Sequence, residues 1–403
     1  MTPSSASAPG RWATTRYKEE RAELLADTSV GGLAFCQAYA ALVDRWLVEL
    51  LGDEEDVALL AVGGYGRAEL CPSSDIDVLL VHRGRRDIAA IADRLWYPLW
   101  DAGLTLGHGV RTAKEAVALA DGELEIATSM LTARPVAGDP TLAAEVIQRS
   151  GEHWRKRGSR WLATLSRSVE ERHQRAGEVA FLLEPELKEG RGGLRDVHAI
   201  EWAEVTRQML LPNGGEAVAH AYRTILAVRV ALHRHTGRPG DQLLLQDQDA
   251  VAEALGDVDA DALMGRLSAA ARVIAWTSDE TWWRVAAALA GPSGRVVSRD
   301  RRLAEGVVSR DGVVELDRDA DPAADPALVL RVAAAAATAG ARISATALDR
   351  LAAAAPPLGG PWPPGALDAL VEVLLAGRAA IPVLEALDQK GLLVRILPEW
   401  EAV

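Results

Sequence analysis

The chain has little of what marks several protein classes. Its 403 residues include two cysteines, Cys36 and Cys71, which are too few and too far apart in sequence to suggest a disulfide framework or a zinc site. No apolar run has the length of a membrane-spanning helix, and the first residues lack the apolar stretch of a signal peptide. These absences argue against a disulfide-rich secreted protein and against a membrane protein, and they predict a cytoplasmic location.

Basic charge is also scarce. The chain has 44 Lys and Arg residues against 57 Asp and Glu residues, and its formal net charge is -13 at pH 7. Proteins that bind nucleic acid without sequence preference need positive charge to neutralise its phosphates. We therefore expect no nucleic-acid partner, and we expect a protein or a small molecule instead. The hydrophobic content of 49% is enough for two or three domains.

Two apolar runs enclose a glycine-rich segment. Residues 57–62 and 78–81 are continuous apolar runs, which are typical of strands buried on both faces. The first run ends at Gly63 and Gly64, which indicates a turn. Residues 67–70 then leave room for little more than one helical turn before a proline. The sequence thus predicts a strand, a glycine-rich turn, a short helix and a second strand.

The second of these strands begins with an acidic pair. Asp75 and Asp77 are separated by one residue, so on a strand both side chains point to the same face. Two such carboxylates, beside a turn whose backbone N–H groups can approach phosphate oxygens, are suited to a divalent metal and a nucleoside triphosphate. The alternative is a solvated Asp-x-Asp at the start of a strand, which is a common arrangement.

A second segment, residues 183–198, combines glycines with cations. Lys188, Arg191 and Arg195 supply three positive charges within eight residues, and three glycines free the backbone between them. Such a loop could hold a triphosphate. The alternative is a surface turn whose charges pair with one another, because acidic residues are interleaved with the cations. The glycines are Gly190, Gly192 and Gly193, and the acidic residues are Glu184, Glu186, Glu189 and Asp196.

These segments carry a family resemblance. Residues 63–80 resemble the signature of the DNA polymerase β-like nucleotidyltransferase superfamily, and the fuller form, with Tyr65-Gly66-Arg67, Pro72 and Ser74, is similar to the PII uridylyltransferase family. Residues 183–198 are similar to the stretch that follows the catalytic domain in that family. A related Lys…Gly-Gly-x-Arg-Asp pattern occurs in glutamine synthetase adenylyltransferases. Two long motifs in the right order are a stronger signal than one glycine pattern.

A third matching stretch covers residues 99–139, and it contains one departure from the family. Relatives typically carry Asp where this chain has Glu123. Many superfamily members use a third carboxylate near the metals, and Glu123 or Glu125 could serve. Either residue could equally be an exposed side chain at the start of a helix.

The resemblance implies a fold and a reaction. The expected fold is an α/β nucleotidyltransferase domain, with a polymerase β-like mixed sheet and helices, followed by mainly α-helical domains. The expected activity is Mg²⁺-dependent (Mn²⁺ is an alternative) transfer of UMP or AMP, from UTP or ATP, to a tyrosine of the PII nitrogen-regulatory protein. Asp75 and Asp77 are the expected catalytic residues and metal ligands, with Glu123 as the third ligand. The expected nucleotide-binding residues are Gly63, Gly64, Arg67, Ser74, Lys188 and Arg195.

Two other functions remain open. The chain could transfer a nucleotide to another acceptor, such as glutamine synthetase or a small molecule. It could also be a catalytically silent nucleotide-sensing module, although the intact Asp75 and Asp77 argue against that. No motif fixes the choice between UTP and ATP, because the base is recognised by individual side chains.

The domain organisation follows from composition and periodicity. We expect residues 1–15 to be disordered, residues 16–145 to form the nucleotidyltransferase domain and residues 150–290 to form a helical domain. Residues 293–403 should contain a small β-excursion and a helical linker. The β-excursion is expected at three valine-rich stretches, and two helices should flank the Pro/Gly-rich segment 355–365. The valine-rich stretches are Val296-Val297, Val307-Val308 and Val313–Leu316.

The end of the chain resembles a connection to further domains. In full-length PII uridylyltransferases, the segment that residues 391–400 resemble leads into a metal-dependent HD phosphohydrolase domain and two ACT domains. Neither follows in this sequence, and none of the eight histidines is followed by Asp. We therefore expect the chain to act as the transferase portion of a multifunctional enzyme, which adds nucleotide without removing it and does not respond to glutamine.

Overall fold

The computed structural model describes residues 8–206, 215–294 and 301–402. The chain forms two compact units, residues 1–285 and residues 286–403, and buried hydrophobic side chains are found in each. Helix α12 (Ala260–Gly294) begins in the first unit and ends in the second. All the site residues that the sequence predicts lie in the first unit.

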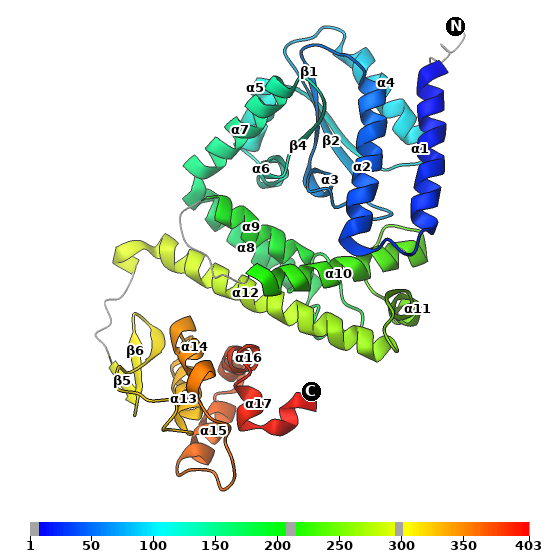
Figure 1. Ribbon diagram of the computed structural model, residues 1–403. Helices are drawn as coiled ribbons and strands as arrows, with labels where there is room; N and C mark the ends of the chain where they lie inside the picture. Colours follow the sequence, from blue (N-terminus) through cyan, green and yellow to red (C-terminus); the bar gives the residue numbers. More distant parts are fainter. Residues whose placement is uncertain (1–7, 207–214, 295–300, 403) are drawn as a thin grey trace. The chain divides into compact units, whose positions relative to one another are not determined.

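A mixed four-stranded sheet lies in the first unit (Figure 1). Its strands follow the order β3 (Leu106–Thr112), β2 (Ile76–His82), β1 (Val57–Ala61) and β4 (Arg134–Gly138). Strand β1 is antiparallel to β2 and β4, whereas β2 and β3 are parallel. Strands β1 and β2 coincide with the two apolar runs, so the prediction of both strands is confirmed.

Helices cover both faces of this sheet, which explains why β1 and β2 are so apolar. In β1, Leu59 belongs to a core shared with α2 and α4, and its neighbour Leu60 belongs to a core shared with α5 and α7. The predicted mixed α/β architecture is therefore confirmed. The helices on the first face are α1 (Ala8–Ala26), α2 (Gly32–Leu51) and α4 (Ile88–Asp101), and those on the second are α5 (Ala113–Ala120), α6 (Leu124–Leu131) and α7 (Pro140–Lys156).

Helix α1 corrects the prediction of disorder over residues 1–15. The helix begins at Ala8, and residues 1–7 lie outside the described residues. Ala13 is buried, and the ring of Tyr17 stacks on Trp46 of α2 with the ring centroids 4.0 Å apart. Packing against α2 therefore stabilises a helix that composition alone does not reveal, because tertiary contacts outweigh local propensity.

The short helix before β2 also differs from the prediction. The helical turn is α3 (Gly63–Gly66), on the glycines themselves, and a non-helical turn follows where the sequence favoured a helix at residues 67–70. Gly63 has a φ of 58°, and a Cβ on Gly66 would collide with the backbone carbonyl of Thr132. Glycine is thus needed at Gly63 for the left-handed backbone conformation at the start of α3, and at Gly66 for close packing against the end of α6.

The rest of the first unit is helical. Helix α9 (Leu194–Val205) shares one core with α1, α2 and α4 and another with α6 and α7, and α10 (Gly215–Thr236) belongs to the first of these cores, so residue 150 does not mark a division between compact units. Trp154 and Trp161 stack with their ring centroids 5.2 Å apart, and both are buried in the core of these helices. Besides α12, the helices are α8 (Gly158–Ala176), α9 (Leu194–Val205), α10 (Gly215–Thr236) and α11 (Leu245–Leu255).

The second unit combines a small sheet with short helices. Strands β5 (Arg301–Ala304), β6 (Val307–Arg310) and β7 (Val313–Leu316) form an antiparallel sheet, so the predicted β-excursion is confirmed at the last two valine-rich stretches. The first stretch, Val296-Val297, lies outside the described residues. The predicted helical linker within residues 293–403 is instead part of a compact unit, residues 286–403. Its helices are α13 (Leu328–Ala339), α14 (Ala345–Ala354), α15 (Ala366–Leu375), α16 (Ile381–Gln389) and α17 (Leu393–Ile396), with 3₁₀ turns at Gly377–Ala380 and Pro398–Ala402.

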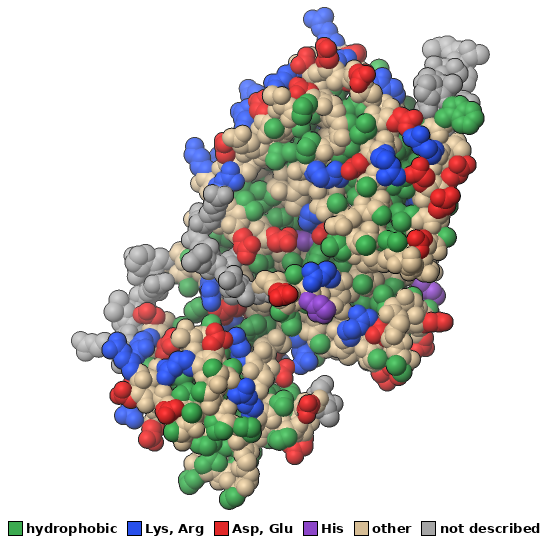
Figure 2. Space-filling model, in the orientation of Figure 1, with side chains coloured by type: hydrophobic (Ala, Val, Ile, Leu, Met, Phe, Trp, Pro, Cys, Tyr) green, Lys and Arg blue, Asp and Glu red, His purple; other side chains and the backbone are tan. Residues whose placement is uncertain are grey.

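Helices α14 and α15 flank the Pro/Gly-rich segment, as the sequence predicts. Over the described residues, no helix is both long enough and apolar enough to cross a membrane. Figure 2 shows acidic and basic side chains interspersed over the face drawn there.

Candidate active site

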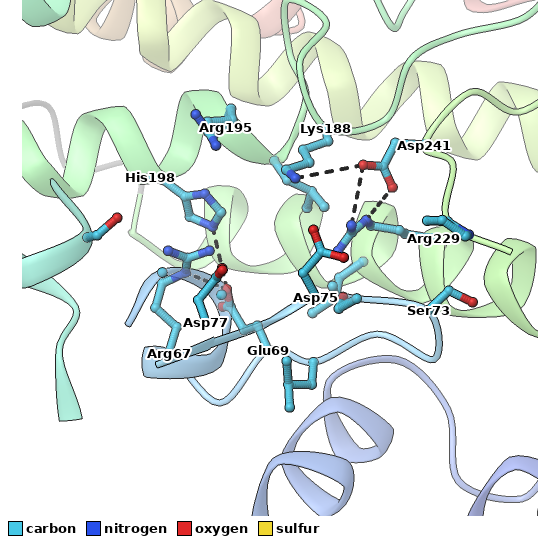
Figure 3. Close-up of a pocket in the computed structure, with 18 of the residues that line it drawn as sticks. Arg67, Glu69, Ser73, Asp75, Asp77, Lys188, Arg195, His198, Arg229 and Asp241 are labelled. Atoms are coloured by element: carbon cyan, nitrogen blue, oxygen red, sulfur yellow. Dashed lines mark hydrogen bonds and ion pairs between the residues drawn. The ribbon is translucent and has the colours of Figure 1, made fainter. Parts of the chain in front are cut away.

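A cavity of about 410 Å³ lies where the sheet meets the helices of the first unit. Asp75 and Asp77 line one side of it, and Lys188 and Arg195 line it from the helical part of the chain (Figure 3). The structure therefore brings together the two motifs that the sequence singled out, although more than a hundred residues separate them.

The acidic pair is placed by strand β2. Asp75 directly precedes the strand and Asp77 is its second residue, with the buried Ile76 between them pointing into the core. Both carboxylates therefore lie on the cavity side, as the alternation of a strand requires. Burial and the neighbouring charge of Asp75 raise the pKa of Asp77 to about 6. Two carboxylates held this close create a demand for positive charge.

Glycines crowd around the carboxylate of Asp77. A Cβ on Gly63 would lie 3.3 Å from its Oδ2, and a Cβ on Gly107 of β3 would collide with its Oδ1. Gly107 pairs with Asp77 in the parallel ladder, so the two residues share a face of the sheet. The glycines at both positions thus leave the space that the carboxylate occupies.

The second motif is a loop anchored by a buried acid. Asp196 has no exposed surface, and it accepts hydrogen bonds from Arg172 and from the N–H of Gly192, the latter at 2.8 Å. His173 Nε2 also lies 2.8 Å from Asp196 Oδ1. A Cβ on Gly192 would collide with the backbone of Ala271, so the loop lies directly against α12. Asp196 therefore holds the loop in place and does not face the cavity.

The anchored loop presents its cations to the cavity. Lys188 Nζ lies 3.9 Å from Asp241 Oδ2, and its side chain is 35% exposed. Arg195 Nε lies 3.6 Å from Glu189 Oε1. By contrast, Arg191 pairs with Glu178 and with Asp279, each at 2.7 Å. Two of the three cations of the motif therefore line the cavity, and Arg191 serves the fold.

Arg67 and Glu69 form a polar cluster at the base of the cavity. Arg67 Nε donates to Glu69 Oε2 at 2.6 Å, and His198 Nε2 lies 3.5 Å from the same oxygen and 2.9 Å from the hydroxyl of Tyr222. Burial, followed by the charge of Arg67, lowers the pKa of His198 to about 4, so its imidazole is neutral at pH 7. The pKa of Glu69 falls to about 2 because His198 and Arg67 outweigh the effect of burial.

Sequence reasoning missed a second group of residues on α10 and the loop after it. Arg229 Nε donates to Asp241 Oδ1 at 2.6 Å, and His233 Nε2 lies 3.2 Å from the same oxygen. These hydrogen bonds hold the pKa of Asp241 well below its ordinary value, although burial acts in the opposite direction. The only signal in the sequence was the i, i+4 spacing of Arg229 and His233, which places both on one helix face.

Two predicted site residues have other roles or places. Glu123 is the N-cap residue of α6 and does not line the cavity, whereas Glu125, half a turn later, does. The prediction of Glu123 as a metal ligand is therefore not supported by its position, because the side chains of the first helical turn diverge around the axis. Ser74 lines the cavity, but its hydroxyl accepts a hydrogen bond from the N–H of Cys71 at 3.0 Å.

The two cysteines lie together despite their separation in sequence. Their Sγ atoms are 3.8 Å apart in the core beneath the cavity, and both thiols are free. Arg229 Nη1 donates to Cys71 Sγ at 3.1 Å.

The donor set at the acidic pair fits magnesium. Over the described residues, no three His, Cys, Asp or Glu side chains cluster as metal ligands, so this edge supplies two carboxylates. Magnesium is typically bound by one or two carboxylates, with substrate phosphates and water completing the octahedron. Asp75 and Asp77 would hold the ion, whose positive charge would offset the two carboxylates that line this side of the cavity.

An acidic strand edge facing cations across a cavity is the kind of site in which enzymes hold a divalent metal and a nucleoside triphosphate. It is characteristic of the nucleotidyltransferase class.

Comparisons with known proteins identify the family. A family model described as GlnD PII-uridylyltransferase matches residues 162–282. The chain is 45% identical to the bifunctional uridylyltransferase/uridylyl-removing enzyme of Streptomyces coelicolor, over 98% of this chain and 49% of that enzyme. It is 44% identical to the enzyme of that name from Mycobacterium tuberculosis, over 91% and 47%, and 36% identical to that of Corynebacterium glutamicum, over 86% and 49%. The chain belongs to the PII uridylyltransferase family, and it spans about half the length of these relatives.

Proposed function

We propose that this chain transfers UMP from UTP to a tyrosine of a PII signal protein and releases pyrophosphate. The proposal rests on one observation: two carboxylates and two cations line the same cavity. They are Asp75, Asp77, Lys188 and Arg195. The names of the relatives favour UTP over ATP as the substrate. The family description, PII-uridylyltransferase, supports a PII protein as the acceptor.

The cations of the cavity would bind the triphosphate. Lys188, Arg195 and Arg229 lie on the helical side, and Arg67 lies beside the acidic pair. Charge-assisted hydrogen bonds from such side chains to phosphate oxygens are short and strong. Lys188 Nζ lies 3.9 Å from Asp241 Oδ2, a distance too long for a hydrogen bond. The side chain of Lys188 therefore breaks no hydrogen bond to Asp241 when it binds a phosphate.

The reaction is an in-line displacement at the α-phosphorus. The tyrosine oxygen forms a bond to phosphorus, the bond to the bridging oxygen of pyrophosphate breaks, and the phenolic proton passes to a carboxylate of the site. Glu125 lines the cavity and is exposed, so it is placed to accept that proton. A bound divalent cation would neutralise charge on the phosphates. The protein's own cations would hold the leaving group, and no covalent intermediate with the enzyme is needed.

The experiment is to incubate the purified chain with a PII protein, Mg²⁺ and either UTP or ATP, and to measure the intact mass of the PII subunit. We expect a gain of one UMP per subunit with UTP, located on tyrosine by fragmentation. A gain of AMP alone would correct the choice of nucleotide. A gain on glutamine synthetase but not on PII would overturn the acceptor, and no transfer to any acceptor would favour a silent module.

A further inference from the structure

A second cavity, of about 350 Å³, adjoins the first. Asp77, Glu125 and Ser129 line both cavities, so the two meet at the carboxylate of Asp77. Lys188 and Arg195 line only the first cavity. The acidic edge therefore has a cationic chamber on one side and a second space on the other, which we call the β3 groove.

The floor of the β3 groove is one face of strands β2 and β3. In the parallel ladder Asp77 pairs with Gly107, Leu79 with Gly109, and Val81 with Arg111. The residues of β3 on this face are thus glycine, glycine and arginine. The absence of a side chain at Gly109 leaves the groove open beside Leu79, whereas the space above Gly107 holds the carboxylate of Asp77. At a rise of about 3.3 Å per residue, it extends about 13 Å from Gly107 to Arg111.

The wall of the groove is apolar. It consists of side chains from α5, from α6 and from the end of β1, and Leu79 and Ile126 pack into the core beneath. The apolar wall residues are Val62, Ala116, Leu119, Ile126 and Met130. A groove with an apolar wall, a glycine in its floor and a carboxylate at one end suits a flat, mostly apolar side chain with a polar tip.

We propose that the β3 groove binds the acceptor polypeptide, with the phenol ring of its tyrosine over Gly109 and its hydroxyl at Asp77. This inference rests on the proposed function. In an in-line displacement, the attacking oxygen and the leaving oxygen lie on opposite sides of the α-phosphorus. Lys188 and Arg195 place the pyrophosphate in the first cavity, so the acceptor approaches from the other side, through the groove.

The position of β3 fits a peptide ligand. It is one of the two edge strands of the sheet, with β2 as its neighbour on one side, in the part of the chain that the structure describes. Its seven residues are exposed or half-buried. Such an edge can pair with an extended segment through backbone hydrogen bonds, and Gly107 and Gly109 remove side chains that would obstruct it. Arg111, which is exposed, lies at the far end to contact residues next to the tyrosine.

The nucleobase is the competing occupant, and the first cavity suits it better. That cavity has Trp202 and Tyr222 in its lining beside the phosphate-binding cations, so one nucleotide can fill it with its base against an aromatic ring. A base in the β3 groove would have to lie beyond Asp77, away from Lys188.

The test fills the groove without touching the acidic pair. In Gly109→Val a Cβ would meet only the Leu79 methyl, at 3.3 Å, and valine suits a strand. We expect the KM for a PII protein to rise at least about tenfold, with the dissociation constant of UTP changed less than about twofold. Val110→Ile is the matched control. Val110 points to the opposite face of the strand and packs against the core that contains α2 and α4.

Arg111→Glu keeps the test valid if Gly109→Val does not fold, since Arg111 is exposed. We expect it to raise the KM for the PII protein, whereas Arg86→Glu, on an exposed turn outside both cavities, should not. Weaker UTP binding with an unchanged KM for PII would overturn the inference and assign the groove to the base. Normal kinetics in both groove variants would overturn it outright. Failure of the wild-type chain to modify any PII protein would instead overturn the proposed function.

Discussion

Asp77 is the residue on which the proposed chemistry most depends. Asp77→Asn keeps the size of the side chain but removes a charge that must offset a metal ion. We expect nucleotidyl transfer to fall at least about a hundredfold, the scale of losing one preorganised electrostatic group. The melting temperature without metal should be unchanged or higher, because a partly buried charge is removed. Near-normal transfer by the folded variant would remove Asp77 from the mechanism.

Gly107 should matter almost as much, although it has no side chain. In Gly107→Ala the new Cβ would collide with Oδ1 of Asp77, and the carboxylate would have to move from its place. We expect the transfer rate to fall at least about tenfold with little change in fold, since misplacing a reacting group by about 1 Å is this costly. Gly265→Ala is the control, because nothing lies within 4 Å of a Cβ there. Equal rates in the two variants would contradict the role of Gly107.

Single residues also show the limits of the sequence. Asp75, Asp77, Lys188 and Arg195 could be predicted to line a site because motif spacing places them on a strand edge and a glycine-rich loop. Asp241 could not, because nothing local distinguishes an aspartate after Pro-Gly from any turn residue. Its significance arises only from the tertiary fold, which brings it to Lys188.

The loop between α8 and α9 carries the next prediction. Lys188→Ala removes a phosphate-binding cation, and the loss of a charge-assisted hydrogen bond costs about 1.5–3 kcal/mol. We expect nucleotide binding, measured by calorimetry with Mg²⁺, to weaken about ten- to a hundredfold. Arg191→Ala is the informative comparison, because Arg191 pairs with Glu178 and Asp279. It should lower the melting temperature and spare the affinity of any protein that remains folded. If Lys188→Ala binds the nucleotide as tightly as the wild type, the loop between α8 and α9 has only a structural role.

Helix α9 gives a prediction about pH. The folded protein keeps His198 neutral down to about pH 4, whereas in the unfolded chain it takes up a proton near its ordinary pKa. The unfolded state therefore binds more protons between these values, and stability falls as the pH decreases through this window. Between pH 7 and pH 5 the loss is on the order of 2 kcal/mol. Between pH 7 and pH 5, the melting temperature of His198→Gln should fall less than that of the wild type. An equal fall in the two proteins would show that His198 does not cause the loss of stability.

Elements were predicted better than their boundaries. Strands β1 and β2 follow from apolar runs that only a sheet covered on both faces would bury. The helical turn was misplaced onto residues 67–70 because propensity disfavours glycine in helices, whereas here α3 uses Gly63 and Gly66 for their geometry. The composition of residues 8–15 predicts disorder, but these residues form the start of α1. Packing of α1 on α2 stabilises the helix, and composition does not reveal that packing.

At the scale of the whole molecule, the two compact units should respond differently to ligand. Every residue of the proposed site lies in residues 1–285, so nucleotide with Mg²⁺ should stabilise that unit. At a ligand concentration of about 100 times the dissociation constant, the gain is about 2.7 kcal/mol. We expect calorimetry to show one transition that moves upward with UTP and Mg²⁺ and a second that does not. Equal movement of all unfolding signals would contradict this division.

The central claim is that the acidic edge and the cationic loop form one metal and nucleotide site. The most direct measurement is a crystal structure of the chain with Mn²⁺ and a UTP analogue that cannot be cleaved at the α-phosphorus. We predict an anomalous manganese peak bound by Asp75 and Asp77, with the β- and γ-phosphates directed to Lys188 and Arg195. A nucleotide bound outside this cavity, or manganese away from both carboxylates, would contradict the account.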